Sequence, residues 1–297
     1  MQKNSKNKYF FGIIFMLITG IGLFILFQSP IALTNKDQET NGQPHKTKAY
    51  GKVNIIKEHK QRPYHTSALK KEQPVIKYFS EPVHITAIGD SLTQGIGDET
   101  KQGGYIGVLE QMFNKRKSTG TFDNFGKRGN RSDQLLKSLN EPDINSSIQR
   151  ANIVLITIGA NDIMQVLKEN ITNLEMDDFT IERQNYENRL VKIIGKIKRI
   201  NPATDIYLLG FYNPFARYFK DIQELEIIAK DWNTTGGNVT KKIDHTYFIP
   251  MMDLFDNTAK EVFADDNFHP NRLGYQLIAE RVLEYINKEK EDDSYGE

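Results

Sequence analysis

Cysteine is absent from this chain of 297 residues, and tryptophan occurs only once. Without cysteine the chain has neither disulfides nor a cysteine on which a lipid anchor could be built. This absence does not exclude export, because a chain of this length can bury a sufficient core without disulfides. An excess of one charge is also lacking: 39 Lys and Arg face 38 Asp and Glu, for a formal net charge of +1. We therefore expect no nucleic-acid partner.

Long apolar runs are scarce, and the one that stands out lies near the N-terminus. Residues 9–27 are uncharged and mostly apolar. As a helix rising ~1.5 Å per residue, they nearly span a ~30 Å hydrocarbon core. Lys3, Lys6 and Lys8 precede this run, which predicts a cytoplasmic N-terminus and an exported remainder. Because no small-residue cleavage site follows cleanly, we expect residues 1–27 to be an uncleaved, single-pass signal anchor rather than a cleaved signal peptide of a secreted protein.

The next segment, residues 28–80, is polar and carries ten Lys and Arg against four Asp and Glu. Such a basic segment could lie near anionic lipid or wall polymer, although a solvated linker is the simpler interpretation. The rest of the chain fits one domain over residues 81–290, followed by a disordered tail at 291–297.

Apolar segments of strand length alternate with helical patterns along this domain. The strand candidates are 83–88, 121–125, 152–158, 205–210 and 246–250. The helical patterns lie at 104–117, 133–139, 181–200, 222–242 and 271–288. This alternation predicts an α/β fold: a three-layer α/β/α sandwich around a mostly parallel five-stranded sheet, similar to flavodoxin. Ligands of such sheets bind beyond the carboxyl ends of the strands.

The segment Gly89-Asp90-Ser91-Leu92-Thr93 directly follows the first strand candidate. It places Ser91 on a turn close to the next helix N-terminus, where free backbone N–H groups favour developing negative charge. A hydroxyl is a poor nucleophile near neutral pH and needs an adjacent base. Ser91 is therefore a candidate nucleophile, and we expect Asp90 to accept backbone hydrogen bonds around the turn.

A candidate base lies near the C-terminus, in residues 265–270. Asp266 precedes His269 by three residues, so one turn of chain can bring its carboxylate to the ring Nδ1. That contact would hold the tautomer whose Nε2 accepts the serine proton. The neighbouring Asp265 is an alternative partner. A metal site is not expected here, because Asp266 and His269 lack clear third and fourth ligands.

Two more segments offer hydrogen-bond donors for an oxyanion. Gly129 follows the second strand candidate, where a glycine lets the backbone approach a substrate. Asn161 follows the third and offers an NH₂ donor without a charge. Donors already in place are typically worth about 10²–10³ in rate each. Gly126 is an alternative to Gly129, Asn161 could instead cap a turn or helix, and Asp162 is expected to be an N-terminal helix residue.

These four segments, in this order, resemble the sequence blocks of the SGNH hydrolases, also called the GDSL lipase/acylhydrolase family. The family blocks read GDS(L), a glycine, GxND and DxxH, and the resemblance covers about residues 83–288. It implies a nucleophile at Ser91 and a base at His269, with Asp266 as its partner. An oxyanion hole is implied at the Ser91 N–H, the Gly129 N–H and the Asn161 side chain. No cofactor is implied.

The order Ser, Asp, His also occurs in α/β-hydrolases, whose nucleophile turn reads G-x-S-x-G. Thr93 stands where that turn has its second glycine, so we exclude that fold.

The resemblance leaves the substrate open, because the family covers lipases, thioesterases, acyl-transferring enzymes and carbohydrate O-deacetylases. An exported, anchored domain favours lipid or wall-polymer esters, so we expect a membrane-anchored, extracytoplasmic acylhydrolase that forms an acyl-enzyme on Ser91. A cell-wall or polysaccharide O-deacetylase and an acyltransferase are the alternatives, and a non-catalytic binding module is a more distant one. Aromatic residues at 211–219 either line an acyl or sugar pocket or pack as a loop. Residues 170–181 either cover the site or form a short surface helix.

Overall fold

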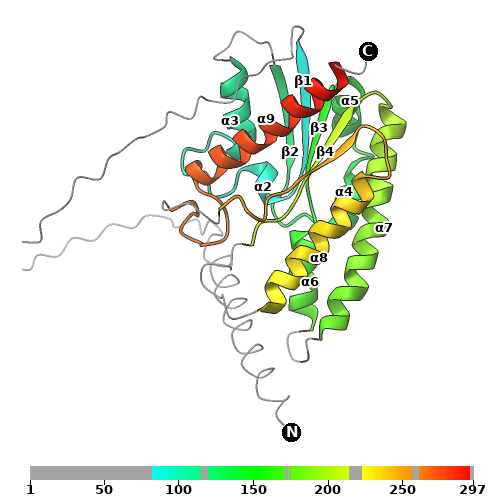
Figure 1. Cartoon of the computed structure of the whole chain (residues 1–297), viewed down its shortest axis with the longest axis vertical. Helices are drawn as coiled ribbons and strands as arrows, with labels where there is room; N and C mark the ends of the chain where they lie inside the picture. The colour runs from blue at the N-terminus through cyan, green and yellow to red at the C-terminus, as the bar shows by residue number, and fades with distance from the viewer. Residues whose placement is uncertain are drawn as a thin grey trace, which may run out of the picture.

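The computed structural model describes residues 82–114, 120–170, 173, 175–213, 223–255 and 261–294. Its strands are β1 Val83–Gly89, β2 Gly120–Gly126, β3 Ile153–Thr157, β4 Asp205–Leu209 and β5 Thr246–Ile249. Its helices, shown in Figure 1, are α2 Ser91–Gln94, α3 Gly104–Asn114, α4 Ser132–Ser138, α5 Pro142–Arg150, α6 Ala160–Glu169, α7 Met176–Ile200, α8 Gln223–Thr240 and α9 Arg272–Ser294.

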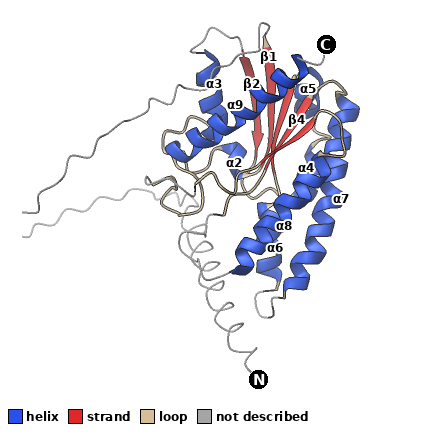
Figure 2. Ribbon diagram, in the orientation of Figure 1, coloured by secondary structure: helices blue, strands red, loops and turns tan. Residues whose placement is uncertain are grey.

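The five strands form one sheet in the order β2-β1-β3-β4-β5, and all four pairings are parallel. Helices α3 and α9 lie on one face, and α4 to α8 lie on the other (Figure 2). The predicted α/β fold with a five-stranded parallel sheet flanked by helices is therefore confirmed.

The central strands β1, β3 and β4 are buried on both faces, whereas the edge strand β2 is partly exposed. In β3, Ile153 and Leu155 pack under α3 and α9, whereas Val154 and Ile156 pack under α7 and α8. Successive strand side chains point to opposite faces, so an unbroken apolar run requires a layer of helices on each side. This is the physical reason why the run reads as a central parallel strand.

The structure corrects several expected boundaries. Helix α7 begins at Met176 rather than at 181, because its first turns are held down by Phe179, which is 2% exposed. Helix α9 continues to Ser294, so most of the expected tail at 291–297 is helical, in keeping with a run of Lys and Glu that favours helix. Helix α5 was not expected, although Pro142 in its first turn is a helix-start signal.

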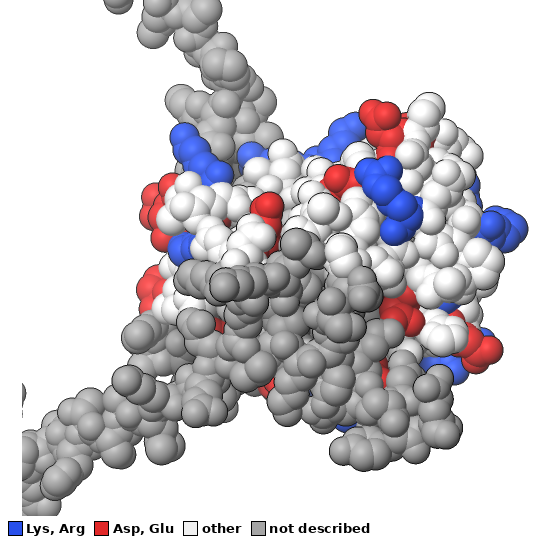
Figure 3. All heavy atoms as spheres, turned by 90° about the horizontal axis from the view of Figure 1, so that it is seen from above, with Lys and Arg blue, Asp and Glu red and all other residues white. Residues whose placement is uncertain are grey.

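The expected membrane anchor and linker, residues 1–80, lie outside the described residues. Within the described part of the chain, no helix is long and apolar enough to cross a bilayer. On the face of the domain seen in Figure 3, Lys and Arg side chains are interspersed with Asp and Glu.

The turn after β1 is supported by a chain of buried polar groups. The Asp90 carboxylate accepts hydrogen bonds from the Leu92 N–H at 3.0 Å and from Thr157 Oγ1 at 2.8 Å. Thr93 Oγ1 continues the chain to Thr157 Oγ1 at 2.7 Å and to the Tyr105 hydroxyl at 3.1 Å. Asp90 thus caps the helix that begins at the next residue, and its predicted structural role is confirmed.

Burial raises the pKa of Asp90 from 3.8 to about 6, although hydrogen bonds from Thr157 and Leu92 and the nearby His269 act to lower it. A carboxyl group with a raised pKa binds its proton more tightly when the protein is folded. The resulting stability is fully present below about pH 4 and is lost as the pH rises through about 6.

We expect Asp90→Asn to remove this pH dependence, because the amide oxygen can still accept the hydrogen bond from Leu92. The free energy of unfolding of the variant should rise relative to that of the wild type between about pH 4 and 7. Denaturant unfolding of both full chains across this range measures the difference. A difference that stays constant with pH would contradict the prediction.

Candidate active site

Ser91 and His269 are 178 residues apart in the chain, yet their side chains are in contact at the carboxyl edge of the sheet. Ser91 Oγ lies 2.9 Å from His269 Nε2, and His269 Nδ1 lies 2.6 Å from Asp266 Oδ2. With the Nδ1–H donated to the carboxylate, Nε2 presents its lone pair to the serine hydroxyl. Ser91 and His269 are each 8% exposed, which leaves only a narrow approach to the pair. The structure thus brings together the three residues that the sequence analysis selected as nucleophile, base and partner.

The loop before α9 is folded around the Asp266 carboxylate. Asp266 Oδ1 accepts hydrogen bonds from the Phe268 N–H at 3.0 Å and the His269 N–H at 2.9 Å. Asn267, which lies between Asp266 and Phe268, has a φ of 54°, a left-handed conformation that asparagine tolerates well. The carboxylate next to the ring is that of Asp266, and not that of Asp265.

These contacts also set the charge of Asp266. Burial acts to raise its pKa, but the hydrogen bonds from the His269 ring, the His269 N–H and the Phe268 N–H outweigh it, so the pKa lies below 3.8. Asp266 is therefore ionised near neutral pH and can stabilise a positive charge on the imidazole.

Two further contacts fix the loop to the domain. The Tyr212 hydroxyl, just beyond β4, donates to the Phe268 carbonyl at 2.8 Å. The Ala264 N–H donates to the His269 carbonyl at 2.8 Å, beside an antiparallel bridge between Phe263 and Pro270. His269 therefore stands on an ordered loop and not within α9.

The space around the two candidate glycines separates their roles. A Cβ on Gly126 would lie 2.1 Å from the backbone nitrogen of Gln94, so Gly126 is required for close packing against α2. Gly129 has a φ of 78°, and a Cβ there would meet nothing within 4 Å. Its backbone is therefore open to a bound molecule. This geometry favours Gly129 over Gly126 as an oxyanion donor, and that role stays a prediction.

Asn130, which the sequence analysis did not single out, links the segments that follow β1, β2 and β3. Its Nδ2 donates to the Gly89 carbonyl at 3.1 Å, and its own carbonyl accepts from Asn161 Nδ2 at 3.0 Å. Asn161 does not cap α6, whose N-cap is Gly159. Because one N–H of the Asn161 amide is committed to Asn130, its orientation is fixed, and the second N–H remains for a ligand. The only sequence signal for Asn130 was its place beside Gly129.

A buried ion pair supports this arrangement from α7. Asp162 accepts hydrogen bonds from the Ser132 N–H at 3.0 Å and from Ser132 Oγ at 2.6 Å, which fastens α6 to the start of α4. Arg189 contacts both, at 3.1 Å from Asp162 Oδ1 and 2.6 Å from Ser132 Oγ. Burial raises the pKa of Asp162, opposed by the bonds from Ser132 and the charge of Arg189. Asp162 therefore holds two helix starts together, as a residue in the first turn of its helix can.

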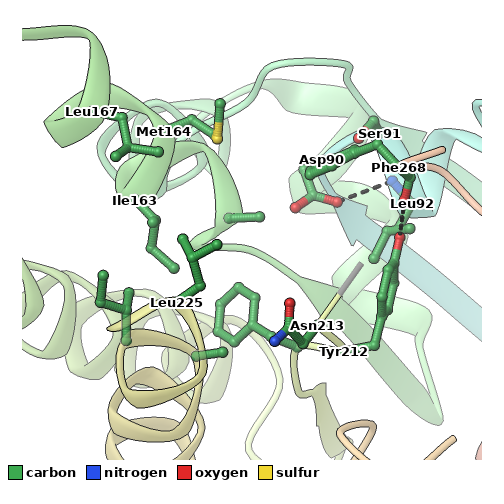
Figure 4. A pocket seen from close by; sticks show the side chains of 14 residues that line it. Asp90, Ser91, Leu92, Ile163, Met164, Leu167, Tyr212, Asn213, Leu225 and Phe268 are labelled. Atoms are coloured by element: carbon green, nitrogen blue, oxygen red, sulfur yellow. Dashed lines mark hydrogen bonds between the residues drawn. The ribbon is translucent and has the colours of Figure 1, made fainter. Parts of the chain in front are cut away.

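An apolar cavity opens beside Ser91 (Figure 4). It has a volume of about 100 Å³ and lies between α6 and α8. Ile163, Met164 and Leu167 of α6 lie across the cavity from Ser91. The remaining wall is formed by Asp90, Leu92, Ala160, Phe211, Tyr212, Asn213, Leu225, Ile228, Ala229 and Phe268. Of the expected aromatic segment 211–219, the first three residues therefore line a pocket, whereas 214–219 lie outside the described residues.

No group of three His, Cys, Asp or Glu side chains within the described ranges is arranged to hold a metal ion. The site presents a hydroxyl, an imidazole, a carboxylate and neutral N–H donors.

Comparison with known proteins agrees with this geometry. The chain is 35% identical over 228 residues to the uncharacterized protein YpmR of Bacillus subtilis (strain 168), which covers 75% of this chain and 89% of that protein. It is 28% identical over 212 residues to the spore germination lipase LipC of Bacillus licheniformis, covering 66% of this chain and 93% of that lipase.

Solved structures show the same fold at lower identity. The lipase Lip_vut3 from a goat rumen metagenome matches with a TM-score of 0.59 and 24% identity, over 67% of this chain and 95% of that one. A mutant of Axe2, an acetyl-xylooligosaccharide esterase from Geobacillus, matches with a TM-score of 0.54 and 18% identity, over 68% and 93%.

The model of the GDSL-like lipase/acylhydrolase family matches residues 87–277, a range that contains all four segments of the site. This chain therefore belongs to the GDSL-like lipase/acylhydrolase family, also called the SGNH hydrolases, and is an esterase- or lipase-like serine hydrolase.

Proposed function

We propose that this protein is a membrane-anchored, extracytoplasmic hydrolase that cleaves carboxylic esters of medium- or long-chain fatty acids through an acyl-enzyme on Ser91. The observation that carries this proposal is the contact of Ser91 Oγ with His269 Nε2 at 2.9 Å, directly beside an apolar cavity. A nucleophile in reach of its base supplies the chemistry, and the cavity supplies a place for an acyl chain.

In the first step Ser91 Oγ bonds to the ester carbonyl carbon, and His269 Nε2 takes the hydroxyl proton. The ionised Asp266 stabilises the imidazolium that forms. The carbonyl oxygen gains a negative charge, for which the N–H groups of Ser91 and Gly129 and the Asn161 amide are the candidate donors. The bond to the alcohol oxygen then breaks, and the alcohol leaves with the proton from His269.

In the second step a water molecule replaces the alcohol. His269 takes a proton from the water as its oxygen bonds to the acyl carbon, and the bond to Ser91 Oγ breaks. The carboxylic acid is released and Ser91 regains its proton. Within the described residues, the N–H groups of Ser91 and Gly129 have no protein acceptor, which leaves them available in both steps.

The cavity wall favours an acyl chain over an acetyl group. Each buried methylene contributes about 0.8 kcal/mol, so the chain of an octanoyl ester could gain several kcal/mol that an acetyl ester cannot. An acetyl group would cover less of the apolar wall between α6 and α8 than a longer acyl chain would. We therefore expect the enzyme to hydrolyse lipid-like esters in preference to acetylated wall polymers.

Replacing Ser91 tests the chemical mechanism. We expect Ser91→Ala to lower kcat for p-nitrophenyl octanoate by about 10⁴-fold or more, because the acyl-enzyme cannot form. Ser146→Ala, which changes an exposed serine on α5, is the matched control and should leave the rate unchanged. Both variants are assayed as full chains in detergent, with their melting temperatures measured. If Ser91→Ala hydrolysed the ester as fast as the wild type, Ser91 would not be the nucleophile.

Filling the cavity tests where the acyl chain binds. We expect Met164→Trp to lower kcat/KM for the octanoate and palmitate esters at least about tenfold, because the larger side chain occupies the methylene sites. Activity on the acetate ester should change less than about threefold. Ile227→Trp, at an exposed position on α8, is the control. Equal losses of kcat/KM on all three esters would argue against an acyl cavity.

The same assays of the wild type test the alternatives. A preference of the wild type for the acetate ester would favour the O-deacetylase. Formation of a new ester from an added alcohol would indicate an acyltransferase.

The anchoring part of the proposal is supported by the apolar run at 9–27 and the three lysines that precede it. We expect the full chain to sediment with membranes and to resist extraction by alkaline carbonate, whereas residues 28–297 expressed without the run should not sediment. Externally added protease should reach the hydrolase domain in intact spheroplasts. If cells that express the full-length chain release a shortened form of it into the medium, a cleaved signal peptide would be indicated instead.

A further inference from the structure

A short segment after β4 connects the apolar cavity with the loop that carries His269. Phe211 lines the cavity, and its ring lies over Gly159 at the start of α6, where a Cβ would be only 2.8 Å from Phe211 Cζ. The next residue, Tyr212, donates its hydroxyl hydrogen bond to the Phe268 carbonyl at 2.8 Å, a contact drawn in Figure 4. The position of these two residues therefore sets both a wall of the cavity and a support of the catalytic loop.

One side chain of α8 holds this segment in place. Asn233 Oδ1 accepts a hydrogen bond from the Phe211 N–H at 2.7 Å, and Asn233 Nδ2 donates to the Phe211 carbonyl at 3.0 Å. The last sheet bond of this strand is made one residue earlier, by the Gly210 N–H to the Ile249 carbonyl. Asn233 thus takes the place of a neighbouring strand at Phe211, which requires a side chain with both an acceptor and a donor.

We propose that Asn233 is a positioning residue for acyl-chain selectivity in this enzyme. Asn233 is not among the described residues that form the cavity wall. It acts through Phe211: by fixing the backbone on both sides of that residue, it keeps the aromatic ring against the acyl chain. This inference rests on the proposed function and adds to it the residue outside the cavity that determines how well a long acyl chain is bound.

The proposal predicts a change in selectivity and not a general loss of activity. In Asn233→Ala both hydrogen bonds are lost, the backbone of Phe211 is released, and its ring no longer forms a fixed wall. We expect kcat/KM for p-nitrophenyl octanoate to fall about tenfold, and that for the acetate to change less than about threefold. Asn233→Asp keeps the acceptor for the Phe211 N–H but places a carboxylate against the carbonyl, so it should change the ratio in the same direction.

A double-mutant cycle shows whether Asn233 works through the ring. We expect Phe211→Ala to lower the octanoate-to-acetate ratio as Asn233→Ala does, and the double variant to show the ratio of Phe211→Ala alone. Asn238→Ala, an exposed asparagine on the same helix, is the matched control and should leave the ratio unchanged. All variants are full chains, with melting temperatures measured, so that a loss of folded protein is separated from a change in selectivity.

The outcomes distinguish this inference from the proposed function. If the wild type prefers octanoate and its activity depends on Ser91, but Asn233→Ala lowers kcat/KM equally for both esters, the inference is overturned and the proposed function stands. The inference would also be overturned if the changes in the octanoate-to-acetate ratio caused by the two single variants multiplied in the double variant, because the two residues would then act independently. If the wild type shows no preference for octanoate, the acyl-cavity proposal and this inference both fail.

Discussion

The parallel pairing of β1 between β2 and β3 is the constraint on which the site depends. The register places Gly89 opposite Gly126 on one side and opposite Thr157 on the other, so the three strands end at the same level. Backbone hydrogen bonds continue this alignment past the strand ends, from the Asp90 N–H to the Thr157 carbonyl and from the Lys127 N–H to the Gly89 carbonyl. Each following segment therefore begins within reach of the other two, and Asn130 joins them with two hydrogen bonds.

The segment with His269 reaches this edge by a different route, because it follows no strand of the sheet directly. Helix α9 packs along α3, and the Tyr275 hydroxyl on α9 donates to the Ile96 carbonyl at 2.5 Å, just beyond α2, the helix that begins at Ser91. Tyr212 holds the same loop from the β4 side. The distance between Ser91 and His269 is therefore set by the packing of a C-terminal helix against the layer that follows the first strand.

The residues proposed for the chemistry and those that line the cavity come from different parts of the fold. The proposed nucleophile, base and oxyanion donors lie in four short motifs, whereas the cavity is walled mainly by α6, α8 and the residues after β4. Residues such as Met164 and Phe211 belong to none of these motifs. A shared fold can carry many substrates on this account, since the wall residues can change without disturbing the hydrogen bonds around Ser91.

The sequence by itself predicted the five strands and a carboxylate partner for His269 at Asp266 or Asp265, and the structure selected Asp266. The central strands β1, β3 and β4 are mostly apolar and buried, which requires a sheet covered on both faces, and a spacing of three residues lets one loop bring carboxylate and ring together. The sequence did not predict α2 or α5, because α2 has only four residues and α5 contributes only two buried apolar side chains, Ile144 and Ile148. The close packing of Gly126 against α2, the contacts of Asn130 and Arg189, and the cavity beside Ser91 came only from the tertiary structure. These features depend on contacts between residues far apart in the chain, and such contacts follow from how the helices pack on the sheet, which local patterns do not specify.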